Sequence, residues 1–138
     1  MRKRLLTCAY WILAASFVVG AVTKYWPGPT FYGPAYSVKF VEWGYPSWFR
    51  FVIGTVEFLC AILLVIPRRE HRFLGAAILV VVLTGATLTH IINRNVLYES
   101  VAAPTLLVVM LAIAWTSRPP NLLTWAKSLT KPVQNSPR

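Results

Sequence analysis

The sequence contains no aspartate and only four acidic residues, against fourteen lysines and arginines, so its formal net charge is +10. Charged residues make up 13% of its 138 positions, half of the roughly 25% that is usual in globular proteins. A soluble domain of this length needs many polar side chains to cover its surface. The composition therefore excludes an ordinary soluble enzyme, and the 57% hydrophobic content excludes a disordered chain.

Cysteine and histidine are also scarce. Cys8 and Cys60 are far apart in the sequence, so a thiol–disulfide relay built on a Cys-x-x-Cys pair has no support. Of the two histidines, His71 lies among arginines in a connecting loop, which leaves no second membrane histidine for a bis-histidine haem. Zinc-ligand spacings and glycine-rich phosphate loops are missing too. We therefore predict no metal and no cofactor. The one cofactor that the sequence leaves open is a quinone.

Four long apolar runs dominate the rest of the sequence. They cover residues 5–22, 49–66, 73–92 and 101–117. As a helix, each run would span about 25–30 Å, close to the thickness of the hydrocarbon core. None has the polar stripe of a soluble amphipathic helix. We expect an all-α integral membrane protein, an antiparallel bundle of four transmembrane helices within residues 1–118, followed by a basic cytoplasmic tail, residues 119–138. The first run is longer than a typical signal-peptide core, which favours a span over a cleaved signal.

Basic residues are unevenly distributed between these runs. Ten lie before the first run, between the second and third, and in the tail, whereas four lie in or beside the other two connections. Because basic residues concentrate on the cytoplasmic side, this bias places both termini in the cytoplasm. The basic residues flank the apolar runs and do not form a surface that could contact nucleic acid. We therefore predict no nucleic-acid partner and expect a lipid bilayer around the protein.

The connection between the first two runs is rich in aromatic residues and contains four prolines. Prolines and glycines argue against one continuous helix there. Tyrosine and tryptophan favour the headgroup layer, so an aromatic extracytoplasmic cap is expected. A lid over a cavity and a docking face for a partner are the alternatives. In the tail, Leu122, Trp125 and Leu129 together with Lys127 predict a short helix on an anionic lipid surface.

Polar groups inside the apolar runs are the candidates for a functional site, because burying them in hydrocarbon is costly. Glu57 lies near the middle of the second run, and Arg50 lies two turns earlier on the same face. By helical rise, Thr84 of the third run lies at about the depth of Glu57. The candidate cluster comprises Glu57, His90, Thr84, Thr87, Arg50 and Ser16. We expect the second and third helices to bring Glu57 together with the face that carries Thr84, Thr87 and His90.

Two interpretations of this cluster remain open. In the structural one, Glu57 is protonated, or is tied to Arg50 through water and to a facing threonine, and it fixes the helix register. In the functional one, the cluster lines a cavity for a polar head such as a quinone ring, and Glu57 or His90 relays protons.

The runs that carry Glu57 and His90 also contain short motifs. Gly44-Tyr45-Pro46 leads into Gly54-Thr55-Val56-Glu57, and the third run opens with Gly75-Ala76-Ala77 and closes with Gly85-Ala86-Thr87-Leu88-Thr89-His90. Over residues 8–118 the chain resembles the DoxX-like family of small bacterial membrane proteins. The resemblance implies four helical spans, with the family's membrane glutamate at Glu57 and its third-span histidine at His90. The founding type is similar to a subunit of thiosulfate:quinone oxidoreductase, and other members are linked to redox-associated membrane complexes.

These observations favour an accessory subunit or assembly protein that binds a lipophilic molecule and is not an enzyme by itself. Its expected partners are a membrane protein complex or further copies of the chain, and the charge bias and the resemblance favour the bacterial inner membrane. The alternative is a quinone-linked redox subunit of a membrane oxidoreductase complex. The alternative requires Glu57 or His90 to face an open cavity.

Overall fold

The computed structural model describes residues 1–31, 33–94 and 97–130, and this part of the chain is almost entirely helical. An isolated bridge between Thr30 and Gly33 is the β-type pairing that it contains. The helices, in chain order, are α1 (Arg2–Tyr25), α2 (Tyr36–Glu42), α3 (Phe49–Val65), α4 (Arg69–Ile92), α5 (Leu97–Ser117) and α6 (Leu122–Thr130). The all-α class predicted from the sequence is confirmed.

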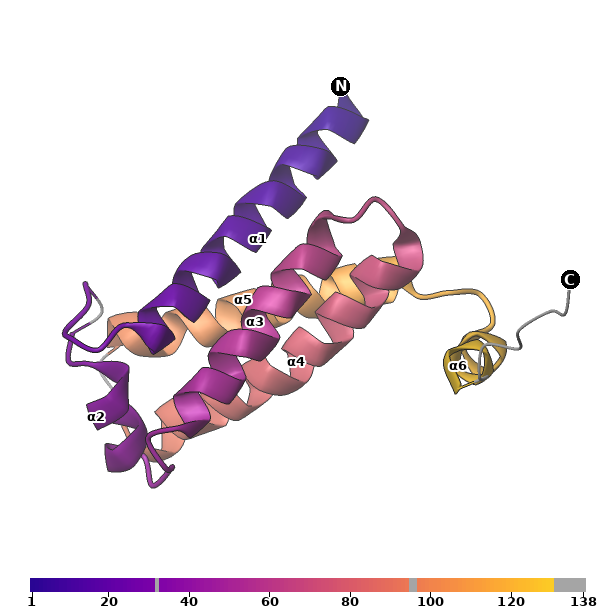
Figure 1. Cartoon of the computed structure of the whole chain (residues 1–138). Helices are drawn as coiled ribbons and strands as arrows, with labels where there is room; N and C mark the ends of the chain where they lie inside the picture. The colour runs from indigo at the N-terminus through magenta and orange to yellow at the C-terminus, as the bar shows by residue number, and fades with distance from the viewer. Residues whose placement is uncertain (32, 95–96, 131–138) are drawn as a thin grey trace, which may run out of the picture.

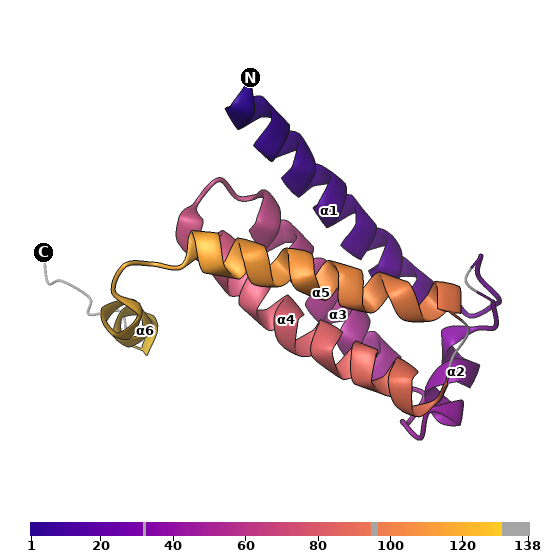
Figure 2. The same ribbon diagram turned by 180° about the vertical axis from the view of Figure 1, so that it is seen from behind.

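The four long helices run alternately up and down (Figure 1). The closest packing joins α4 with α5, α1 with α3 and α3 with α4, so that each long helix lies against its neighbour in the chain. Within the described residues, α1 and α5 make no close backbone approach, and the N-terminal half of α1 diverges from the other helices (Figure 2). The arrangement is thus a series of antiparallel helices that is open between its first and last members. The short helix α2 lies at one end, and α6 extends from the other.

Helix boundaries follow from proline and from local capping. Two helices end just before a proline, α1 at Tyr25 before Pro27 and α3 at Val65 before Pro67. This is expected because the residue before proline is disfavoured in the α conformation. Helix α1 continues past the predicted end at residue 22, and the hydroxyl of Thr23 bonds back to the carbonyl of Gly20 at 2.8 Å. Helices α4 and α5 begin at residues 69 and 97, each earlier than the predicted 73 and 101.

Two glycines allow the helices to approach closely. A Cβ atom on Gly54 would lie 3.0 Å from the Tyr25 ring and 3.3 Å from the carbonyl oxygen of Ala21, so α1 and α3 touch here with no side chain between them. At Gly75, a Cβ would lie 3.0 Å from Cβ of Leu63 and 3.1 Å from the carbonyl of Cys60. Close contacts of this kind through small residues drive helix association in membranes, where van der Waals packing replaces the hydrophobic effect.

The outer surface of the long helices is apolar. Large side chains such as Trp11, Val81 and Val108 are 60%, 73% and 66% exposed. Within the described residues, three helical segments are long and apolar enough to cross a membrane: Arg4–Tyr25, Arg69–Ile92 and Ser100–Ser117. An apolar exterior on helices of this length is stable only where lipid surrounds it. The chain is therefore a membrane protein.

Candidate functional site

The strongest polar contact in the helical core is an ion pair between α1 and α3. Lys24 Nζ lies 2.7 Å from Glu57 Oε2, and the two side chains are only 12% and 9% exposed. Gly20, one turn before Lys24, lies beside this contact, and a Cβ there would lie at an ordinary van der Waals distance of 3.6 Å from Glu57 Oε2. An unpaired charge at such a depth is strongly destabilising, so each partner depends on the other. The pair ties the C-terminal end of α1 to the middle of α3.

The ammonium group of Lys24 has two further partners. It donates to the carbonyl of Gly20 at 3.3 Å, and it lies 5.2 Å from the centroid of the Tyr36 ring on α2. Lys39 of α2, which is buried, lies 5.5 Å from the same ring. Cations over an aromatic face are attracted by the negative potential of the ring. Helix α2 is thereby held beside the ion pair through Tyr36.

Arg50 stabilises the end of α1 instead of pairing with Glu57. Its Nη1 donates to the carbonyls of Lys24 at 2.7 Å and Trp26 at 3.1 Å. The last carbonyls of a helix have no partner within the helix and carry the negative end of its dipole, so a guanidinium group suits them. The structural interpretation tied Glu57 to Arg50 through water and to a facing threonine, whereas the structure pairs Glu57 with Lys24.

Arginines play the same part at two other helix ends. Arg72 Nε donates to the carbonyl of Leu64 at the end of α3, at 3.2 Å, and its guanidinium stacks 4.0 Å from the Tyr10 ring centroid. Arg69 Nη2 donates to the carbonyl of Thr116 near the end of α5, at 3.0 Å. In each case an arginine near the start of one helix caps the end of another. These arginines therefore fix which helix ends lie together.

The hydroxyl groups of the predicted cluster bond to their own helices. Ser16, Thr84 and Thr87 each donate to the carbonyl four residues earlier, at 2.9, 2.7 and 2.7 Å. Ser16 and Thr84 are exposed on the outer surface, and Thr87 is partly buried. Back-bonding of this kind satisfies a hydroxyl in an apolar environment without a second helix. The hydrogen bond of Glu57 goes to Lys24, so these hydroxyls are not its partners.

His90 lies at the end of α4, beside the segment that follows α2. Its ring packs edge-on against Trp43, with 5.3 Å between centroids. The neighbouring Thr89 is buried, and its hydroxyl donates to the carbonyl of Gly85 at 2.9 Å and lies 3.0 Å from the Tyr45 hydroxyl. Because the hydroxyl proton of Thr89 is donated within α4, the Tyr45 hydroxyl is the donor in the contact between the two residues. His90 and Thr89 thus join α4 to the aromatic segment rather than to Glu57.

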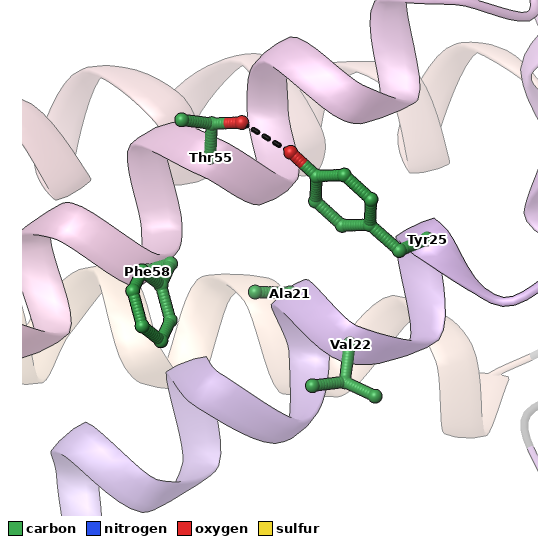
Figure 3. Close-up of a pocket in the computed structure, with 5 residues that line it drawn as sticks. All are labelled: Ala21, Val22, Tyr25, Thr55 and Phe58. Atoms are coloured by element: carbon green, nitrogen blue, oxygen red, sulfur yellow. Dashed lines mark hydrogen bonds between the residues drawn. The ribbon is translucent and has the colours of Figure 1, made fainter.

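A separate apolar groove lies between α1 and α3 (Figure 3). It is lined by Ala21, Val22 and Tyr25 of α1 and by Thr55 and Phe58 of α3, and its volume is about 240 Å³. Val22, Tyr25 and Phe58 are 55%, 49% and 45% exposed, so the groove opens on the outer face of the two helices. The groove lies beside Gly54, which contacts two of its lining residues, Ala21 and Tyr25.

The hydroxyl groups at the groove are already engaged. Thr55 donates to the carbonyl of Phe51 at 2.7 Å, so the Tyr25 hydroxyl, which contacts Thr55, donates to Thr55 or to that carbonyl. Neither hydroxyl retains a proton for a ligand. The groove therefore offers hydrocarbon contacts and little else.

Metal-binding groups do not gather in the part of the chain that is described. No set of three histidine, cysteine or acidic side chains lies close enough there to hold an ion. Both cysteines are free, Cys8 exposed on α1 and Cys60 buried in α3. The groups that the structure does assemble are a buried ion pair, a set of arginine caps and a hydrocarbon groove.

Comparison with known proteins gives one match. The model of a family described as DoxX-like matches residues 8–116, which is most of the chain. Searches of curated proteins and of solved structures give no match.

Proposed function

The chain belongs to the DoxX-like family and is a membrane protein, and we propose that it is an accessory subunit or assembly protein that binds a lipophilic molecule. The groove between α1 and α3 carries this proposal. It opens on the outer surface of two helices, and its lining is apolar. A volume of about 240 Å³ lies below the roughly 300–1,000 Å³ of pockets that enclose a whole drug-sized ligand. The groove fits one hydrocarbon chain better than a complete substrate.

The ion pair supports a structural role for Glu57. A carboxylate that relays protons must be reached by the group that it serves, whereas Glu57 is covered and bonded to Lys24. His90 likewise packs against Trp43. Neither residue lines the groove, so the geometry favours the accessory function over a quinone-linked redox subunit.

The proposal includes an orientation in the membrane. Helices α1, α3, α4 and α5 are the four spans, and the 17 residues of α3 reach about 26 Å at 1.5 Å per residue. The basic residues at the amino end and in the connection between α3 and α4 support an orientation with both termini in the cytoplasm. The membrane that we propose is the bacterial inner membrane. Helix α2 and its aromatic neighbours then lie at the opposite surface, where tyrosine and tryptophan are favoured.

The test is capture of the tagged chain from native membranes in mild detergent, with mass spectrometry of the proteins and small molecules that remain bound. We expect a defined membrane protein partner in near-stoichiometric amount, retained by Glu57→Gln because the amide keeps the contact with Lys24. The opposite outcome is a bound quinone that is lost in Glu57→Gln while the protein remains folded. That outcome would replace the accessory function with the redox one.

A further inference from the structure

We propose that the groove between α1 and α3 is the binding site of one anionic phospholipid, whose acyl chain lies in the groove and whose phosphate meets Arg50 at the outer rim. This inference rests on the proposed function and names the class of lipophilic molecule. The apolar lining, in which both hydroxyls are engaged, selects a hydrocarbon chain and disfavours a polar ring.

Aromatic contacts connect the groove to Arg50. The Tyr25 ring, which lines the groove, packs against Phe51 with 5.1 Å between centroids, and the Arg50 guanidinium lies 4.2 Å from the Phe51 centroid. Along α3, Arg50 precedes Phe58 by eight residues, or about 12 Å of helical rise. A phospholipid has the same order of groups, with its phosphate at the surface and its chain pointing inward.

The charge of Arg50 is available to an anion. Its two hydrogen bonds go to neutral carbonyls through Nη1. Nε is covered by protein, so the terminal nitrogens are the ones that an anion can reach. Among the described residues, the ion pair is between Lys24 and Glu57, and no carboxylate pairs with Arg50. Guanidinium groups form strong charge-assisted hydrogen bonds with phosphate. Nη2 of Arg50, which makes no hydrogen bond with the described residues, is the donor for this contact.

The experiment uses phosphatidylglycerol with a photoreactive group in its acyl chain, added at low level to the full-length protein in phosphatidylcholine nanodiscs. After illumination, the labelled positions are mapped by mass spectrometry. We expect labelling around Val22 and Phe58 to be about fivefold stronger than at Val108, an exposed residue of α5 that samples bulk lipid. A matched phosphatidylcholine probe is expected to label the groove about fivefold more weakly, in keeping with the contribution of one arginine to binding of an anionic headgroup.

Two matched variants localise the site. Val22→Phe fills the groove and is expected to lower this labelling about fivefold, whereas Val19→Phe makes the same change one turn earlier, outside the groove, and leaves it unchanged. Arg50→Gln is expected to abolish the preference for phosphatidylglycerol. Because Arg50 also caps α1, the valine pair keeps the test decisive if that variant does not fold.

Four outcomes would overturn the inference. Labelling of the groove no stronger than at Val108, or equal loss in both valine variants, removes the groove as a lipid site. Equal labelling by the two probes removes the anionic head. In either case, a partner protein still captured from membranes leaves the proposed accessory function standing. If capture is instead lost in Val22→Phe alone and the groove is unlabelled, a partner helix occupies the groove.

Discussion

Replacement of Glu57 by alanine is expected to destabilise the protein by about 3 kcal/mol, because it leaves the ammonium group of Lys24 buried without its counter-charge. Removal of one partner of a buried pair typically costs about 3–5 kcal/mol, and side chains that are 12% and 9% exposed belong to this class. The lower end applies because Lys24 keeps its contacts with the carbonyl of Gly20 and the ring of Tyr36. Glu57→Gln retains an oxygen acceptor and should cost about half as much.

A double-mutant cycle of Lys24→Met, Glu57→Leu and the variant that carries both separates the pair from other effects. Removal of both charges at once leaves no buried ion, so the double variant should recover most of the stability lost in the single variant. The double variant is then no less stable than either single variant, so the coupling energy of the cycle is expected to be at least about 3 kcal/mol. The assay is reversible unfolding in mixed micelles with a rising fraction of sodium dodecyl sulfate, followed by circular dichroism. Two results would refute the conclusion that the ion pair holds α1 and α3 together. One is that the stability losses of the two single variants add up in the double variant, and the other is a loss below about 1 kcal/mol for Glu57→Ala.

Three further substitutions test the packing and the arginine caps in the same unfolding assay. Gly54→Ala should cost about 1–3 kcal/mol, because the new methyl group would lie 3.0 Å from the Tyr25 ring. Gly85→Ala, which meets nothing within 4 Å, is the matched control and should be neutral or stabilising by up to about 1 kcal/mol; equal losses at the two glycines would contradict the close approach. Arg72→Gln should cost about 1–2 kcal/mol through the lost hydrogen bond to the carbonyl of Leu64 and the lost ring stacking, and an unchanged midpoint would show that the cap contributes nothing.

The long helices could be predicted from the sequence because their apolar runs are uninterrupted and match the thickness of a membrane. Their ends were less predictable, since polar residues such as Thr23 and Lys24 continue α1 once they find partners. Helix α2 was not predicted, because the prolines of this segment argue against one continuous helix but not against a short one. Between Pro34 and Pro46 the chain is long enough for the two helical turns of α2. Local sequence thus determines where an apolar helix exists more firmly than where it stops.

The partner of Glu57 could not be predicted from the sequence, because periodicity along one helix does not show which residue of another helix faces it. Arg50 lies on the same face of α3 as Glu57, but its side chain reaches the carbonyls at the end of α1, which carry a partial negative charge. Lys24 could have been found only by extending α1 one turn beyond Gly20 and pairing its face with that of α3. The groove was not predicted either, because its shape depends on how α1 and α3 pack against each other.

Hydroxyl groups illustrate the same limit. Thr84 and Thr87 were grouped with Glu57 by depth, yet depth alone does not distinguish a hydroxyl that bridges two helices from one that bonds back to its own. The structure shows back-bonding at both positions, while the buried Thr89, which the sequence analysis did not select, contacts Tyr45 across the interface. Helical periodicity from the buried Leu79 and Leu83 leads to positions 86, 87 and 90, so it gave no signal for Thr89.

The most direct test of a lipophile-binding accessory protein compares what remains bound to the wild-type chain, Val22→Phe and Val19→Phe after identical gentle purification, by native mass spectrometry. The groove predicts that the wild type and Val19→Phe carry the same bound lipophilic mass, and that Val22→Phe loses it while the helical content is unchanged. Retention of that mass by Val22→Phe at the wild-type level would contradict the assignment of the site to α1 and α3.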